Sequence, residues 1–433
     1  MANDKDFTLK EGIEVGGSTK NSLGTISASN AVDLSTGNYF THTPAGPTTY
    51  SFTNPGAVQS FQMQLTGGQE AVANAFSTTL YAGTSGSPLT INNGLNLSGD
   101  GGLVWIKERD GTTNHKMGST DASGNHSDIL GSNQAAAAAQ NYMPTYFGLN
   151  SNGFTTTNTL GDTKTNGKNY VSWSFKITPK FFDIVTYTGN GASSRTLSHN
   201  IGGDVGMVMI KGINETEGWV CYHRSLPTGY VLQLNTSSAQ TNMANSIDHI
   251  SGSTVTVTTA GNPSYSANDN NVNYVAYIFG HDTTSDSMIQ CGSVAYNSGA
   301  TVNLGWSPQW VMTKDTAAGN WNIADAARGI GDDGSRGPTL YPDVGNSESA
   351  NGATVIRTAT GFTMPSGVFS PSTQLYVAIR SAAATSITYP SSVKFQGGIA
   401  PQTPANGETD LLTFSTKDGG TSYTGVHSID NAS

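Results

Sequence analysis

The strand sequence Gly102-Leu-Val-Trp-Ile-Lys107 decides the fold of this chain, because similar strands return at Gly206-Met-Val-Met-Ile-Lys211 and Gln309-Trp-Val-Met-Thr-Lys314. A second strand follows each copy, at Asn169-Tyr-Val-Ser-Trp-Ser-Phe175, Asn273-Tyr-Val-Ala-Tyr-Ile-Phe279 and Leu375-Tyr-Val-Ala-Ile379. The separation is 66 positions from Val104 to Tyr170, 66 from Val208 to Tyr274 and 65 from Val311 to Tyr376. Two motifs held together over three copies predict a tandem array of one β domain.

Composition also favours strands over helices. Only 12% of the 433 residues are charged, against about 25% in ordinary soluble domains. Thr, Tyr and Val favour pleated strands, whereas Gly and Asn favour the tight turns between them. A chain of this length is too long for one hydrophobic core, so we expect an all-β protein of three or four domains.

Global signals exclude several classes of partner. The formal charge of -10, with 20 Lys and Arg, provides no basic stripe for nucleic acid. No apolar run approaches the roughly 18 residues of a membrane helix, and Met1-Ala-Asn-Asp-Lys5 begins no signal peptide. Cys221 and Cys291 fall in different repeats and outside any C-x-x-C motif. We expect buried thiols and folding in a reducing host cytoplasm.

Alternation along the second strand predicts a sheet with one face on a core. Val171, Trp173 and Phe175 share one face, and the smaller Ser172 and Ser174 share the other. This pattern is typical of a β-sandwich. The first strand is apolar on both faces, so we expect it to lie centrally in the sheet. The Ala-rich stretch from Asn133 to Gln140 is expected to be a short helix or a loop.

The two ends of the chain differ from the middle. Residues 31–66 contain short strands, among them the alternating Phe61-Gln-Met-Gln-Leu65. Near the C-terminus, Leu411-Leu-Thr-Phe414 and Tyr423-Thr-Gly-Val426 flank a Lys-Asp-Gly-Gly turn. That arrangement predicts a β-hairpin.

These end sequences resemble small β domains of structural proteins in tailed bacteriophages, found in many marine and cyanobacterial phages. The resemblance is carried by Asp33-Leu-Ser-Thr-Gly-Asn38 and Tyr389-Pro-Ser-Ser-Val-Lys-Phe395. The middle repeats resemble a phage-associated domain that is often tandem, through Tyr187-Thr-Gly-Asn-Gly191 and Trp219-Val-Cys-Tyr-His223. The resemblance covers most of the chain and implies a virion protein, but its motifs are structural and supply no active site.

In the phage domains the two end segments run on continuously, which implies an insertion at Gly67-Gly68 with Ser381–Thr385 as the return linker. Hairpin tips tolerate such insertions. We therefore expect three tandem antiparallel β-sandwich repeats inserted into a discontinuous, jelly-roll-like small β domain. The predicted boundaries are 1–68 with 385–433 for the small domain, and 69–179, 180–284 and 285–384 for the repeats.

The sequence offers no persuasive catalytic or metal-binding pattern. Asp332-Asp333 and Asn268-Asp-Asn-Asn271 lack the spacing of a calcium loop. The histidines show no i, i+4 pairing, and no G-x-S-x-G elbow is present. A glycosidase pair in the repeats would have to come from Glu108, Glu215, Glu217 or Glu348, and Glu215 and Glu217 stand in a context that indicates a turn. We expect no enzyme activity, no metal and no cofactor.

Aromatic residues provide the candidates for glycan contact, because sugars combine apolar ring faces with polar edges. Trp219 and Trp321 follow the strand lysines by eight and seven residues, and His115 takes this place in the first copy. A recurring Trp in a strand indicates core. Trp306, between Gly305 and a Pro two residues later, is predicted on a loop, and Tyr142 and Tyr146 are the other candidates.

Together these observations predict a non-enzymatic virion surface protein. We expect a tail fibre or similar appendage that contacts other virion proteins and host surface glycans, acting as a homo-oligomer such as a trimer. A capsid decoration protein or head fibre is the structural alternative, and a polysaccharide depolymerase is the enzymatic one.

Overall fold

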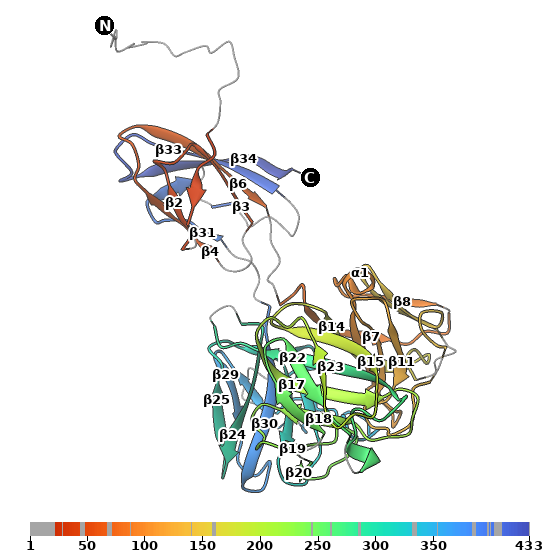
Figure 1. The fold of residues 1–433 in the computed structure, drawn as a ribbon. Helices are drawn as coiled ribbons and strands as arrows, with labels where there is room; N and C mark the ends of the chain where they lie inside the picture. Colours follow the sequence, from red (N-terminus) through yellow and green to blue (C-terminus); the bar gives the residue numbers. More distant parts are fainter. Residues whose placement is uncertain are drawn as a thin grey trace, which may run out of the picture. The chain divides into compact units, whose positions relative to one another are not determined.

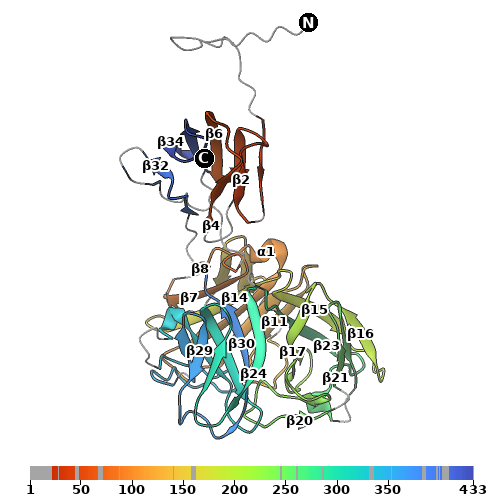
Figure 2. The same cartoon turned by 90° about the vertical axis from the view of Figure 1, so that its left-hand side faces the viewer.

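The computed structural model divides the chain into two compact units (Figures 1 and 2). The end unit combines residues 1–70 with 383–433, and the repeat unit comprises residues 71–382. The structure describes residues 22–432 apart from 28, 44–47, 67–71, 87, 140, 158–161, 244–245, 260–261, 285–286, 331–335, 353, 383–386, 396–397, 399 and 402–408. The expected insertion point Gly67-Gly68, part of the return linker and Asp332-Asp333 lie outside the described residues.

Both ends of the chain contribute strands to the end unit. Its strands are β1 (Thr25–Ile26), β2 (Ala31–Asp33), β3 (Tyr39–His42), β4 (Thr48–Thr49), β5 (Ser51–Thr53), β6 (Gln59–Thr66), β31 (Ile387–Thr388), β32 (Val393–Phe395), β33 (Thr409–Thr416) and β34 (Tyr423–Ala432). The main sheet has the order β3-β6-β33-β34-β32. Within it, β6 pairs with β33 along its whole length, from Gln59↔Thr416 to Thr66↔Thr409.

The core of the end unit is aromatic. Phe61 and Phe414 stack at 5.1 Å between ring centroids, one from each end of the chain. The predicted hairpin is confirmed, because β33 and β34 pair antiparallel around Gly419 and Gly420, whose φ angles are 66° and 85°. However, β3 pairs with β6 and β32 with β34 in parallel. A jelly roll is built from antiparallel strands, so these two parallel pairs depart from the expected architecture. Parallel neighbours cannot be joined by a tight hairpin, and other segments of the chain lie between the two partners of each pair.

We predict that cutting the chain at 67–71 and 381–385 leaves the two end pieces associated. Separating them would break the β6–β33 ladder and expose Phe61 and Phe414 to water. Both side chains are at most 1% exposed in the intact unit. Limited proteolysis followed by size-exclusion chromatography and mass spectrometry measures this. End pieces that elute apart without denaturant would refute a shared end unit.

The repeat unit contains three sets of strands. The first repeat holds β7 (Phe76–Ala82), β8 (Leu89–Asn92), α1 (Leu97–Asp100), β9 (Gly102–Glu108), β10 (Lys116–Thr120), β11 (His126–Leu130), β12 (Phe147–Asn150), β13 (Gly153–Thr156) and β14 (Asn169–Lys176). The second holds β15 (Phe182–Thr188), β16 (Arg195–Ser198), β17 (Asp204–Gly212), β18 (Val220–His223), β19 (Tyr230–Val231), β20 (Thr241–Asn242), β21 (Ile247–Ile250), β22 (Thr254–Val257), the 3-10 turn η2 (Pro263–Tyr265) and β23 (Asn273–His281). The third holds β24 (Ile289–Tyr296), β25 (Ala300–Asn303), β26 (Pro308–Asp315), β27 (Asn322–Asp325), the 3-10 turn η3 (Ala326–Arg328), β28 (Ile356–Thr358), β29 (Gly361–Met364) and β30 (Ser372–Arg380).

Each repeat pairs a large sheet with a three-stranded sheet. The large sheets have the orders β11-β10-β9-β14-β7, β15-β23-β17-β18 and β24-β30-β26-β27, and the small ones β12-β13-β8, β16-β22-β21 and β25-β29-β28. The first predicted strand of each copy (β9, β17, β26) has a partner on both sides, which confirms its central position. The Ala-rich stretch 133–139 forms turns and a bridge to Ile129, with no helix.

Backbone register corrects the sequence comparison in the third copy. Tyr170 lies opposite Glu108 and Tyr274 opposite Gly212, but Gln374 lies opposite Asp315 at the matching point. The Tyr-Val motif at Tyr376 is therefore two residues out of structural register. A two-residue offset keeps every side chain on its original face, so the apolar pattern conceals it.

The large sheets are buried on both faces, which corrects the expectation of one covered face. In the first repeat, Val104 and Tyr170 belong to an outer core beneath the three-stranded sheet. The opposite face carries Trp105 and Trp173, which belong to a different cluster. Even Ser172 is fully buried.

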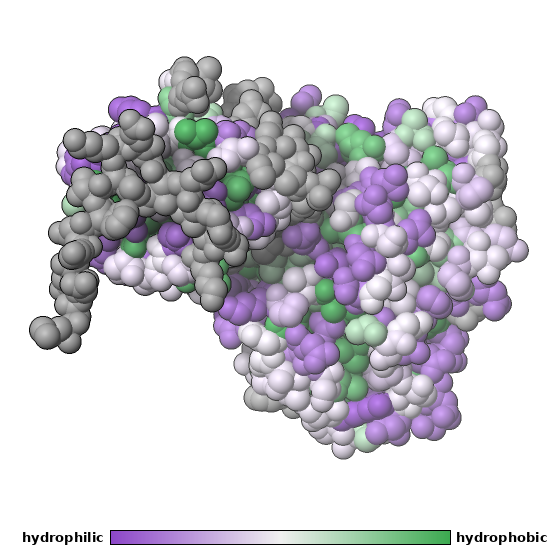
Figure 3. Space-filling model, turned by 90° about the horizontal axis from the view of Figure 1, so that it is seen from above, coloured by the Kyte–Doolittle hydropathy of each residue, from purple (hydrophilic) through white to green (hydrophobic). Residues whose placement is uncertain are grey.

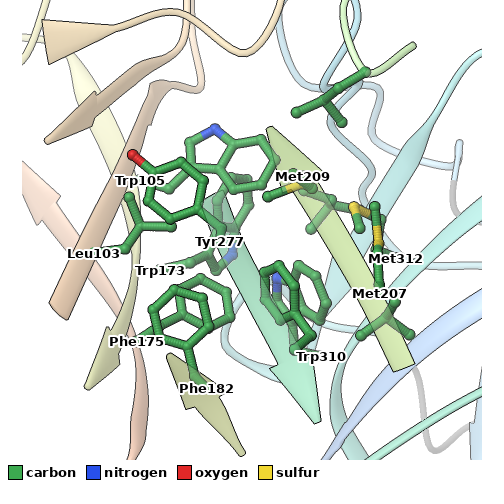
Figure 4. Packing of buried hydrophobic residues seen from close by; sticks show 14 of the residues in the cluster. Leu103, Trp105, Trp173, Phe175, Phe182, Met207, Met209, Tyr277, Trp310 and Met312 are labelled. Carbon is green, nitrogen blue, oxygen red and sulfur yellow. The ribbon is translucent and has the colours of Figure 1, made fainter. Parts of the chain in front are cut away.

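That second cluster is a core shared by all three repeats (Figure 4). Phe175 of the first repeat lies 5.6 Å from Phe279 of the second and 5.9 Å from Trp310 of the third, measured between ring centroids. Both cysteines are free, buried thiols in this core, as predicted. The three predicted β-sandwich repeats therefore share one core, which their sequence pattern did not indicate. Each repeat buries a second face that only its neighbours can cover.

Contacts between repeats form a closed cycle. Trp219 of the second repeat donates its Nε1–H to Gly131 O of the first at 3.0 Å, and Trp321 of the third donates to Gln233 O of the second at 2.9 Å. His115 of the first contacts Tyr341 O of the third through Nε2 at 2.9 Å. The same contact thus repeats head to tail and closes after three copies, like a cyclic trimer made from one chain.

Candidate functional site

Trp306 is not a surface residue, which corrects its selection as a glycan candidate. Its side chain is 7% exposed and packs in the outer core of the third repeat. Its Nε1–H donates to Ser287 Oγ at 2.8 Å, so its polar edge is also satisfied inside. The preceding Gly305 has a φ of 81°, a backbone conformation that lets the loop turn Trp306 inward.

Tyr142 and Tyr146 lie together, with ring centroids 5.9 Å apart in an edge-on arrangement. Tyr146 is 38% exposed, whereas Tyr142 is half-buried and packs against the outer core of the first repeat. The pair remains accessible in part, but it lies on a turn between β11 and β12, and the cleft described below is formed by the third repeat.

The residues predicted as core behave as core. Trp219 and Trp321 are 0% and 3% exposed, and His115 is fully buried at the equivalent position. Their backbone N–H groups have equivalent acceptors in Asn235, Asp343 and Asn133. This common hydrogen bond confirms the alignment made from the sequence.

His115 differs from its two tryptophan equivalents because it can titrate. Its Nδ1 accepts the Nε1–H of Trp105 at 2.9 Å, which requires the neutral ring. Burial first, and then the positive charge of Lys107, lowers the pKa of His115 to about 3. The unfolded chain takes up this proton near pH 6.5, so the stability that depends on neutral His115 is lost as the pH falls below that value.

We predict that W105M combined with H115W reduces the acid sensitivity of the repeat unit. Met209 and Met312 occupy the position of Trp105 in the other repeats, so the double variant gives the first repeat their Met–Trp pair. Between pH 7.5 and 5, the wild type should lose roughly 2 kcal/mol more stability than the variant. Urea unfolding at both pH values measures this, and the other titrating groups cancel in the comparison. Parallel pH dependence would refute it.

Three buried lysines occupy one equivalent position. Lys107, Lys211 and Lys314 are at most 1% exposed, and each ammonium donates to two backbone carbonyls of the loop that follows. Burial lowers the pKa of each to about 8. Because all three repeats share the arrangement, we interpret these lysines as structural ties for the loops.

Glu217 and Lys211 interact electrostatically and form the nearest thing to an acid–base pair in the second repeat. Burial, followed by the charge of Asp269, raises the pKa of Glu217 to about 7. Such shifts are typical of functional sites. However, Glu217 is only 8% exposed, and the Lys211 ammonium is bound to Gly212 O and Glu215 O. Glu215 and Glu217 lie in the loop after β17, as predicted, and the Lys211 ammonium is already bound by the carbonyls of this loop.

The first and third repeats meet through a charged network. Arg109 of the first repeat binds Glu348 of the third through two hydrogen bonds of 2.8 and 2.9 Å. Arg328 also contacts Glu348 at 3.2 Å and binds Asp325 at 2.7 Å. Asp325 accepts the Nε1–H of Trp173 at 2.9 Å. We call these residues the closing seam, because they join the two repeats farthest apart in the chain.

A polar cleft in the third repeat, with a volume of ≈ 610 Å³, is the best candidate binding site. It lies between the loop after β26 and the segment leading into β30. The lining includes Asp315, Ala318, Asn320, Arg336, Tyr341 and Phe369. Such a volume suits a small ligand. None of these residues is among the candidates for glycan contact that the sequence predicts.

The origin of the cleft is visible in the equivalent loops. Asp110 in the first repeat accepts the backbone N–H of Asn169 at 2.6 Å, and Asn214 in the second accepts that of Asn273 at 2.7 Å. Ala317 occupies this position in the third repeat and has no side-chain acceptor. The loop is also one residue shorter there, because Trp321 follows Lys314 by seven residues, whereas the equivalent separation in the other repeats is eight. A signal was thus present in the sequence, as a shortened loop with Ala in place of Asp or Asn.

Surface chemistry gives little reason to look for an apolar contact. The exposed large apolar side chains of the described residues are Leu23, Val58, Leu80, Tyr146 and Val426. On the face shown in Figure 3, hydrophobic and hydrophilic residues are mixed. Among the described residues, no helix has the length and apolar character to span a membrane. No three His, Cys, Asp or Glu side chains in this part of the chain are arranged to hold a metal ion.

Comparison with known families assigns most of the chain to one family. One family model matches residues 72–377, which lie within the repeat unit. The match begins just before β7 and ends within β30. The chain belongs to the family described as a domain of unknown function, DUF7483. The DUF7483 match spans all three repeats at once, as expected if they share one core. No curated protein and no solved structure matches this chain.

Proposed function

We propose that this chain is a non-enzymatic structural protein of a bacteriophage virion surface, most simply a tail fibre or appendage protein that contacts host glycans. The observation that carries the proposal is the insertion itself. A closed three-repeat unit interrupts a small β unit whose two halves still pair through β6 and β33. This arrangement suits an anchor joined to a presented binding unit.

The chemistry of the repeat unit supports binding over catalysis. Its three buried lysines bind loop carbonyls, its closing seam pairs buried charges, and its cleft presents amide, carboxylate and aromatic groups. The resemblance of the end sequences to phage structural domains supports the virion location. Partners under this proposal are other virion proteins and a host surface glycan, with a homo-oligomer, such as a trimer, raising avidity.

Mass spectrometry of purified phage particles carrying this gene product tests the proposal. We expect peptides of this chain in the particle, at a copy number that is a small multiple of three or six relative to the major capsid protein. Tens to hundreds of copies would instead favour a capsid decoration protein or head fibre. Absence from purified particles would refute a virion protein.

A separate assay tests the non-enzymatic part. Purified protein incubated with host capsular or surface polysaccharide should release no new reducing ends. Release that increases with protein concentration would favour the depolymerase alternative.

A further inference from the structure

We propose that the cleft of the third repeat binds an uncharged saccharide, by stacking on Phe369 and by hydrogen bonds to Asp315 and Asn320. The inference rests on the proposed glycan contact and adds a specific site and ligand chemistry to it. It replaces the earlier aromatic candidates, of which Trp306 is buried.

The polar wall of the cleft is held in place before any ligand arrives. Asp315 is 5% exposed, and its Oδ1 accepts the Ala317 N–H at 2.8 Å. Its Oδ2 accepts Ser372 Oγ–H at 2.8 Å, and Gln374 Nε2 donates to the same Ser372 oxygen at 2.9 Å. A carboxylate oxygen accepts more than one hydrogen bond. The fixed Asp315 carboxylate therefore suits adjacent hydroxyl donors, which a sugar edge supplies.

The opposite wall is aromatic and aliphatic. Phe369 is half-buried and packs edge-on against Tyr296, with ring centroids 5.4 Å apart and an interplanar angle of 87°. Pro371 and Tyr341 also line the cleft. The cleft thus combines an aromatic ring with an oriented carboxylate in its lining, which are the groups that match the apolar face and polar edge of a pyranose.

Charge favours a neutral ligand. Among the described residues that line the cleft, Asp315 is the acidic one and Arg336 is the basic one, so the formal charges balance. A phosphorylated ligand would require more cationic groups. The chain as a whole carries a formal charge of -10, which also repels polyanionic glycans.

The cleft is a property of the third repeat, because the hydrogen bond between this loop position and the neighbouring strand in the other repeats is absent there. Asp110 and Asn214 make that bond in the other repeats, and Ala317 takes their place. The exposed Ala318 beside it also lines the cleft. A large side chain at this position is expected to fill the cleft without disturbing the core.

The test uses the full chain on an array of neutral oligosaccharides ending in glucose, galactose, mannose or N-acetylhexosamine, beside sialylated and uronic acid probes. We expect binding to a neutral probe. Titration with that probe should then show at least a roughly 10-fold loss for A318W and a loss of about 3- to 10-fold for F369L. The matched control is T216W, at an exposed position of the equivalent loop in the second repeat, which should bind within about twofold of wild type.

Three outcomes of the binding experiments overturn the inference. Selective binding to acidic probes refutes the ligand class, and no binding to any probe refutes the site. Wild-type affinity in folded A318W and F369L places any glycan contact elsewhere, which leaves the virion proposal intact. Thermal unfolding of each variant separates loss of fold from loss of binding, and F369L decides the question if A318W does not fold. Absence from the virion would refute the proposed function while leaving measured binding to the cleft valid.

Discussion

Replacing Phe175 by Ala should destabilise the repeat unit by about 3–5 kcal/mol, the range for removing a fully buried aromatic side chain. Phe175 is 0% exposed. It contacts Phe76 of its own repeat and Phe279 of the second. It also contacts Phe182 of the second repeat and Trp310 of the third, both of which Figure 4 labels. The cavity would therefore open where three sheets meet, and no single repeat can collapse to fill it.

The informative measurement is amide hydrogen exchange together with denaturant unfolding. F175A should raise exchange in the large sheets of all three repeats. The matched control is F154A, an equally buried Phe in the outer core of the first repeat. Its effect should concentrate in the first repeat. If F175A also raises exchange in the first repeat alone, the shared core does not make the three repeats cooperative.

The sequence predicted the strand pair, its three copies and the all-β class, because local apolar patterning determines these features. The pairing of β33 with β34 followed from the turn residues between them. The shared core was missed because alternation in β14 suggested one core face, and the small side chains of Ser172 and Ser174 suggested solvent. In fact both side chains are buried, and Asn93 donates from Nδ2 to Ser174 Oγ at 2.8 Å.

The site was harder to predict than the fold. Trp306 was selected because its glycine and proline neighbours indicate a loop, but a loop can also return a side chain to a core. The cleft depends on what the third repeat lacks, namely an Asp or Asn at Ala317 and one residue of loop length. That difference can be recognised only once backbone pairing shows which residues are equivalent. The Thr316 N–H donates to Thr373 O in the third repeat, and the Arg109 N–H donates to Asn169 O in the first. Ala317 is therefore the equivalent of Asp110.

The closing seam provides the second large expected effect. E348A removes both hydrogen bonds to Arg109 and the contact to Arg328, whose side chain has no exposed surface. Breaking a buried ion pair by deleting one partner costs about 3–5 kcal/mol, because the remaining charge stays buried. Arg109 is partly exposed and Arg328 retains Asp325. We therefore expect a loss at the lower end, roughly 3 kcal/mol.

A matched control shows whether this loss comes from the seam or from charge removal alone. Asp100 forms an exposed pair with Lys176 at 3.3 Å within the first repeat, and D100A should cost less than about 1 kcal/mol. Urea unfolding of both variants gives the comparison. The double variant R109A/E348A should recover part of the loss, since neither half of that pair is then left without its partner. Equal, small effects of E348A and D100A would mean that the apolar core closes the cycle without the seam.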